Sequence, residues 1–111
     1  MDRIHARKTQ IVEVSYSRAK SFLNQHHIQG YTPAKWYYGL EYKNELMSIM
    51  SFGTPRTGIG KKRDNTAELI RFATAAPVVG AASKLLKHFL KSHAFEKIIS
   101  YSDNEWSQGH L

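Results

Sequence analysis

The first third of the chain combines a short strand pattern with a longer helical one. Residues 11–14 (Ile-Val-Glu-Val) alternate in a way that predicts a β-strand. Ser15 or Ser17 can cap a helix that continues to about residue 28. Its apolar positions recur at helical spacing, so we expect one buried face made of Ala19, Phe22, Leu23 and His26. Gly30 and Pro33 then end the helix.

The middle of the chain predicts a β-hairpin. Residues 36–43 and 46–52 are both rich in aromatic and β-branched side chains, and Asn44-Glu45 between them is a tight-turn signal. Trp36, Tyr38 and Leu40 alternate onto one face of the first strand, which favours core packing over base stacking. Residues 53–64 contain three glycines, a proline and four basic residues, so we expect a loop there.

The last third predicts a strand, a helix and a second strand. The strands are expected at 67–74 and 96–101, and the helix at 79–91 with Ala82, Leu85, Leu86 and Phe89 buried. A helical crossover of this kind joins parallel strands. Residues 104–111 should begin another helix. The fold class is therefore α/β (α+β), a mixed sheet flanked by helices.

Length and composition limit the classes of protein to be considered. The 111 residues fit one domain, 1–111, in which we expect residues 1–10 to be flexible. The absence of cysteine excludes a disulfide scaffold and any cysteine-ligated metal site. Apolar runs are too short to span a bilayer, and the N-terminus lacks the apolar stretch of a signal peptide. We therefore expect a cytoplasmic protein with no membrane partner.

The chain is strongly basic. Its 16 Lys and Arg residues outnumber 9 Asp and Glu, which gives a net charge of +7. Such an excess favours a polyanionic partner, either nucleic acid or an anionic cofactor, although solubility alone is an alternative explanation. Within the predicted loop, a basic group flanks two glycines and would bind nucleic-acid phosphate or remain a solvated loop; it consists of Arg56, Lys61, Lys62 and Arg63.

Small residues open the predicted 79–91 helix. Unpaired amide groups at a helix start attract phosphate, and small side chains let a ligand approach the backbone. The same residues would also allow close packing of the helix on the sheet. The candidate cofactor-binding residues are Val79, Gly80, Ala81, Ala82, Ser83 and Lys84.

These features support a family resemblance. Gly80-Ala81-Ala82-Ser83-Lys84-Leu85-Leu86 resembles part of the acyl-CoA motif of GNAT acyltransferases. The wider chain resembles phage Mom-like DNA-modification proteins and related domains associated with phage homing endonucleases. The segments that carry this wider resemblance are 27–30, 46–53, 68–72, 80–86 and 98–103. It implies a GNAT-like fold, acetyl-CoA or another acyl-CoA as cofactor, a nucleic-acid substrate and, for a phage protein, the host cytoplasm.

The chain departs from the family pattern at two places. Pro77 stands where the family usually has Arg or Gln. The sequence also stops at Leu111, before the Tyr that serves many GNAT enzymes as general acid, so relative to the family the fold is expected to be C-terminally truncated. Both departures keep open a second function: a non-catalytic module that binds DNA or inhibits a host protein.

Three residues are candidates for the reacting centre. Glu68 would deprotonate an amine or amide nucleophile, directly or through water. Arg71 lies three residues further along the same strand, a spacing that predicts opposite faces of the sheet. Asp103 follows the last strand and would either orient the substrate or cap the next helix. A structural ion pair or an exposed charge is the alternative for Glu68 and Arg71. No metal site is expected, since His26-His27 lacks nearby carboxylates.

Overall fold

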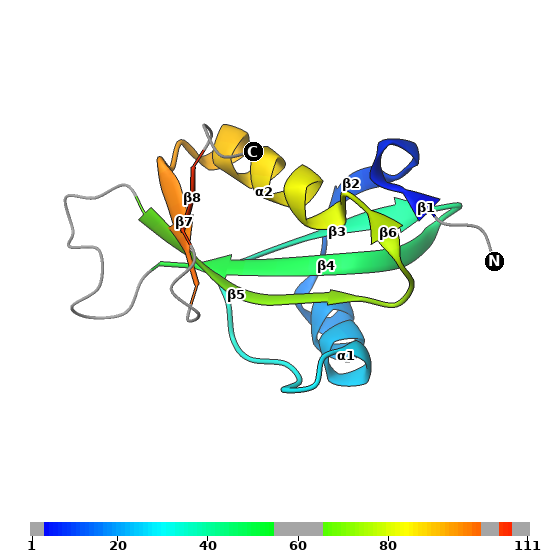
Figure 1. The fold of residues 1–111 in the computed structure, drawn as a ribbon. Helices are drawn as coiled ribbons and strands as arrows, with labels where there is room; N and C mark the ends of the chain where they lie inside the picture. The colour runs from blue at the N-terminus through cyan, green and yellow to red at the C-terminus, as the bar shows by residue number, and fades with distance from the viewer. Residues whose placement is uncertain (1–3, 55–65, 101–104, 108–111) are drawn as a thin grey trace.

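A mixed sheet with one helix on each face forms the centre of the protein in the computed structural model, which describes residues 4–54, 66–100 and 105–107 (Figure 1). The elements along the chain are β1 (Ile4–His5), the 3-10 helix η1 (Ala6–Lys8), β2 (Gln10–Glu13), α1 (Tyr16–His26), β3 (Trp36–Tyr42), β4 (Glu45–Gly53), β5 (Thr66–Thr74), β6 (Val78–Val79), α2 (Ala81–His93), β7 (Lys97–Ile99) and β8 (Glu105–Ser107). The predicted mixed α/β class is confirmed.

The strand order explains how the sheet is both parallel and antiparallel. Six strands lie in the order β2-β3-β4-β5-β7-β8, and β1 and β6 form a separate parallel pair. β5 and β7 are parallel and are joined through α2, whereas the other neighbours in the large sheet are antiparallel. The predicted parallel pair with its crossover helix is therefore confirmed.

The turn of the β3–β4 hairpin lies one residue earlier than predicted. Tyr42 pairs with Glu45, so the two turn residues are Lys43 and Asn44. Both have positive φ, 51° and 68°, as a two-residue turn that follows the twist of the strands requires. The prediction of Asn44-Glu45 as the turn was wrong, because Asn44 takes the second left-handed position and Glu45 begins β4.

Helix α1 covers one face of the sheet and is capped as predicted. The Ser15 hydroxyl accepts a hydrogen bond from the Arg18 amide, and Ala19, Phe22 and Leu23 are buried. The helix ends at His26, because His27 is already extended. His26 is exposed, contrary to prediction, because it is the last residue of the helix, although its ring packs on that of Phe22.

Helix α2 covers the opposite face (Figure 1). Its buried side centres on aromatic packing. Leu85, Leu86 and Phe89 are buried as predicted. The Phe89 ring stacks on that of Phe52, with centroids 3.8 Å apart. Ala82 is only half-buried, contrary to prediction, because it faces a cleft described below.

Two histidines and a tyrosine lie at the C-terminal end of α2. The hydroxyl of buried Tyr38 is 2.6 Å from Nε2 of His93. Burial lowers the pKa of His93, the neighbouring His88 lowers it further, and Glu13 opposes both effects. The neutral ring is therefore favoured, and its Nε2 shares a hydrogen bond with the Tyr38 hydroxyl.

The lowered pKa of His93 predicts how stability depends on pH. The folded state takes up this proton less readily than the unfolded state, so unfolding becomes easier as the pH falls below about 6.5. His93→Gln keeps a polar partner for Tyr38 without a titrating ring, and should flatten the stability profile between pH 7.5 and 5. Urea unfolding across this range measures the effect. A variant profile as steep as that of the wild type would exclude this role for His93.

Part of the N-terminal segment, expected to be flexible, is packed in the structure. Ile4 and His5 pair in parallel with Val78 and Val79. The following turn is buried at Ala6, and the Lys84 ammonium donates to the carbonyl oxygens of Ala6 and Thr9, each 2.7 Å away. This segment therefore lies beside the start of α2.

The chain near its C-terminus forms a strand and not the predicted helix. Glu105–Ser107 pair antiparallel with Lys97–Ile99 as β8. The free edge of β7 offers backbone hydrogen bonds that favour an extended chain over a helix there. The prediction of a helical start at residue 104 was therefore wrong for residues 105–107.

Candidate functional site

A cleft lies along β5 beyond the end of β7. Thr66–Glu68 pair with Lys97–Ile99, and the pairing stops there although β5 continues to Thr74. Beyond Glu68, β5 therefore has no strand partner on that side within the part of the chain that the structure describes. A cleft of about 440 Å³ lies at this position.

One arm of the cleft is apolar. Five of its lining residues also belong to or pack on the hydrophobic core beneath α2: Met50, Leu69, Phe72, Ala82 and Leu86. They come from three neighbouring elements, β4, β5 and α2. Such a wall suits an aliphatic or thioester group and offers no charge to an ionic one.

The other arm is polar and lies towards the loop that follows α1. It is lined by His27, Gln29, Arg71 and Ser100, together with Ile70. The cleft therefore places an apolar surface and a cationic, hydrogen-bonding surface next to each other at one edge of β5.

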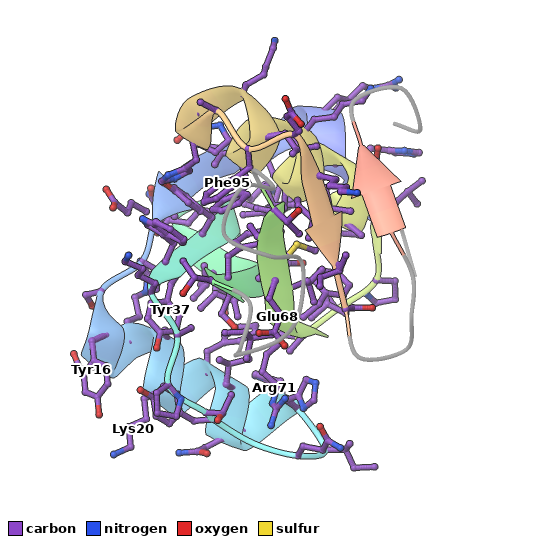
Figure 2. All side chains as sticks on the ribbon, turned by 90° about the vertical axis from the view of Figure 1, so that its left-hand side faces the viewer. Tyr16, Lys20, Tyr37, Glu68, Arg71 and Phe95 are labelled. Atoms are coloured by element: carbon purple, nitrogen blue, oxygen red, sulfur yellow. The ribbon has the colours of Figure 1, made fainter. Side chains whose placement is uncertain are left out.

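A β-bulge determines which side chains face the polar arm. Ser51 pairs with Arg71 and Phe52 with Leu69, so Ile70 is the extra residue on β5. Leu69 and Phe72 consequently share the α2 face. Glu68 and Arg71 share the α1 face, as Figure 2 shows. The predicted opposite orientation of Glu68 and Arg71 was wrong, because the bulge shifts the alternation by one residue.

Arg71 is fixed by the backbone around it. Its Nε donates to the Gly30 carbonyl at 3.0 Å and its Nη1 to the Ile70 carbonyl at 3.1 Å. The guanidinium has further N–H groups, which leaves donors for a ligand. Half-buried at the cleft, Arg71 can hold an anionic group such as phosphate or polarise a carbonyl.

His27 joins Arg71 in the polar arm. Burial lowers the pKa of His27 and the positive charge of Arg71 lowers it further, so the neutral ring is favoured. Its Nδ1 accepts a hydrogen bond from the Gln29 amide at 3.0 Å, which leaves the proton on Nε2. The sequence analysis assigned His27 no part in binding or catalysis, because its place in the cleft depends on the loop after α1.

Glu68 lies deeper than Arg71. Its side chain is 4% exposed and is not part of the cleft wall. Thr66 and Ser51 are also buried on this face, and their hydroxyl oxygens have no hydrogen-bond partner. The three side chains form a buried polar group behind the cleft, where a carboxylate can exchange a proton with the cleft only through an intervening group such as water.

The predicted cofactor-binding segment contributes only partly to the cleft. Of its six residues, Ala82 lines the cleft, and the other five do not: Val79, Gly80, Ala81, Ser83 and Lys84. Gly80 caps α2 with a left-handed φ of 83°, without a side-chain cap and with no acidic residue in the first turn. The Lys84 ammonium already binds two carbonyl groups of the N-terminal segment.

The remaining sequence candidates divide into two groups. Asp103 and the basic loop of Arg56, Lys61, Lys62 and Arg63 lie outside the residues that the structure describes. Tyr38 and Leu40 are buried on the α2 face with Trp36 packed against them, as alternation predicts.

The sequence matches no model of a known protein family, and no curated protein sequence resembles it significantly. Neither helix within the described ranges has the length and apolar character needed to cross a bilayer. Among the described residues, no group of three or more His, Asp or Glu side chains is arranged to hold a metal ion. The cleft, with its apolar and polar arms, is therefore the feature from which a function is inferred.

Proposed function

We propose that the protein is an acyl-CoA-dependent transferase that acts on nucleic acid. In this proposal it has a GNAT-like fold and is related to phage DNA-modification proteins. The observation that carries the proposal is the cleft along β5 beyond the end of β7. Its apolar arm suits the acyl carrier, and its polar arm suits a phosphate-bearing acceptor. The net charge of +7 supports a polyanionic substrate.

The residues present fit an acyl-CoA. The apolar side chains of the cleft would surround the acyl end of its carrier chain. Of the start of α2 only Ala82 lines the cleft, so the phosphates would lie outside the cleft, at first-turn amides that no side chain caps. When bound, the group would supply an activated thioester, and the chain supplies everything else in the reaction.

Three residues would act on the acceptor. Arg71 would hold a phosphate of the nucleic acid beside the cleft, since the backbone fixes its guanidinium and leaves donors free. Glu68 would receive the proton of the attacking amine through water, because its carboxylate is buried behind the cleft on the same face. His27, favoured neutral, would donate a hydrogen bond from Nε2.

Filling the apolar arm should prevent acyl-CoA binding. Acetyl-CoA at 100 times its dissociation constant should stabilise the wild-type fold by about 2.7 kcal/mol. Ala82→Phe places a ring in the arm and should remove this stabilisation, as measured by thermal unfolding with and without acetyl-CoA. Ser92→Phe is the matched control, because Ser92 is exposed in the last turn of α2 and lies outside the cleft. If acetyl-CoA stabilised Ala82→Phe as much as it stabilises the wild type, this cleft would be excluded as the cofactor site.

A second function is favoured by the contacts of Lys84. Its ammonium is engaged by the N-terminal segment, and Pro77 replaces a polar residue of the family motif. Both features support a non-catalytic module that binds DNA as an accessory domain or inhibits a host protein. Such a module would show no stabilisation of the wild type by acetyl-CoA in the experiment above.

A further inference from the structure

A row of lysines follows the outer face of α2. Lys84, Lys87 and Lys91 are three and four residues apart, so they project from one side of the helix. This side is opposite the buried face made by Leu85, Leu86 and Phe89. Lys87 and Lys91 are exposed, and the row is about 10 Å long at the rise of an α-helix.

The N-terminal turn extends this row. Lys84 donates to the carbonyls of Ala6 and Thr9, which bound the turn that carries Arg7 and Lys8. Arg7 and Lys8 are exposed. We define the α2 basic surface as Arg7, Lys8, Lys84, Lys87 and Lys91.

The stability of the helix does not explain this surface. Within the described residues, α2 and η1 contain no acidic side chain that would neutralise it. Like charges three or four residues apart destabilise a helix, and a cation near its N-terminus opposes the helix dipole. A solvated helix face usually mixes both signs of charge, so a row of one sign is better suited to an anionic partner.

We propose that the α2 basic surface binds the phosphate backbone of duplex DNA. The inference rests on the nucleic-acid partner of the proposed function but does not require acyl transfer. The exposed large apolar side chains of the described residues are Tyr16, Ile28 and Val79, and none belongs to the surface, so it offers no ring on which the bases of a single strand would stack. The exposed face of a helix can contact the phosphates that border the wide major groove of B-form DNA, whereas the major groove of A-form RNA is narrow.

The test is DNA affinity as a function of salt. For duplex DNA of random sequence, the logarithm of the association constant should fall linearly with the logarithm of salt concentration. Lys87→Ala/Lys91→Ala should flatten the slope by about 1.8, about 0.9 for each lost contact. Lys84 stays unchanged because it also holds the N-terminal segment. The control is Lys20→Ala/Lys35→Ala, which removes two exposed lysine charges outside the α2 basic surface.

Each outcome decides the inference. A flattened slope in the α2 variant alone, with circular dichroism unchanged, supports the surface. Equal flattening in both variants would mean that net charge alone matters, and an unchanged slope in the α2 variant would exclude this surface. A wild type that binds anionic phospholipid vesicles but not DNA at low salt would also overturn the inference. Acetyl-CoA binding is measured independently of these outcomes and therefore tests the proposed function separately.

Discussion

Replacing Phe89 by alanine should lower the free energy of unfolding by about 3–5 kcal/mol. Phe89 is 0% exposed, and its ring stacks on Phe52 at 3.8 Å between centroids and lies edge-on to Trp36 at 5.5 Å. The residue therefore joins α2 to the sheet. Its removal loses both the transfer free energy of the ring and the packing around the cavity left behind. Urea unfolding of both proteins measures the difference.

Ile28→Ala provides the control for this measurement. Ile28 is 100% exposed, so the same class of truncation should change stability by no more than about 0.5 kcal/mol. A loss below about 1.5 kcal/mol for Phe89→Ala would contradict the packing of α2 described here. It would mean that the aromatic stack is not central to the fold.

Glu68→Gln should lower the rate of acyl transfer by about 10²–10⁴-fold, the contribution typical of a general base. The amide has nearly the shape of the carboxylate but cannot accept the proton. Acetyl-CoA affinity should stay unchanged, because Glu68 is buried outside the cleft wall. Rates with labelled acetyl-CoA and titration calorimetry separate the two effects. Glu45→Gln, at an exposed carboxylate of β4, should leave both unchanged.

An equal loss of transfer in Glu45→Gln would show that general charge, and not the position of Glu68, is responsible. A Glu68→Gln protein with the full wild-type rate would exclude Glu68 as the base. Lost acetyl-CoA affinity in this variant would instead indicate a structural role for the carboxylate.

Local patterns predicted most of the architecture. The crossover from β5 through α2 to β7 followed from periodicity, because apolar positions with periods of two and 3.6 must face a core. The predicted elements were wrong where several weak local conformational preferences compete. The turn at Lys43 and Asn44 was displaced by one residue, and the strand pairing of β8 depends on an edge that local sequence does not encode.

The candidate site was less predictable than the fold. The bulge at Ile70 brings Glu68 and Arg71 to one face, and simple alternation cannot anticipate an extra residue in a strand. His27 reaches the cleft only because the loop after α1 returns to β5, where Gly30 accepts a hydrogen bond from Arg71. Lys84 was expected near a phosphate, and its contacts with distant Ala6 and Thr9 have no local signal.

The central claim is acyl transfer to nucleic acid at the cleft along β5 beyond the end of β7. The most direct measurement incubates the wild-type protein with radiolabelled acetyl-CoA and duplex DNA, and then determines the label retained on the purified DNA. The account predicts that label accumulates with time and in proportion to protein, and that Ala82→Phe abolishes it. Stabilisation by acetyl-CoA without any labelled DNA would contradict nucleic acid as the acceptor. The absence of both stabilisation by acetyl-CoA and label on the DNA would contradict the transferase itself.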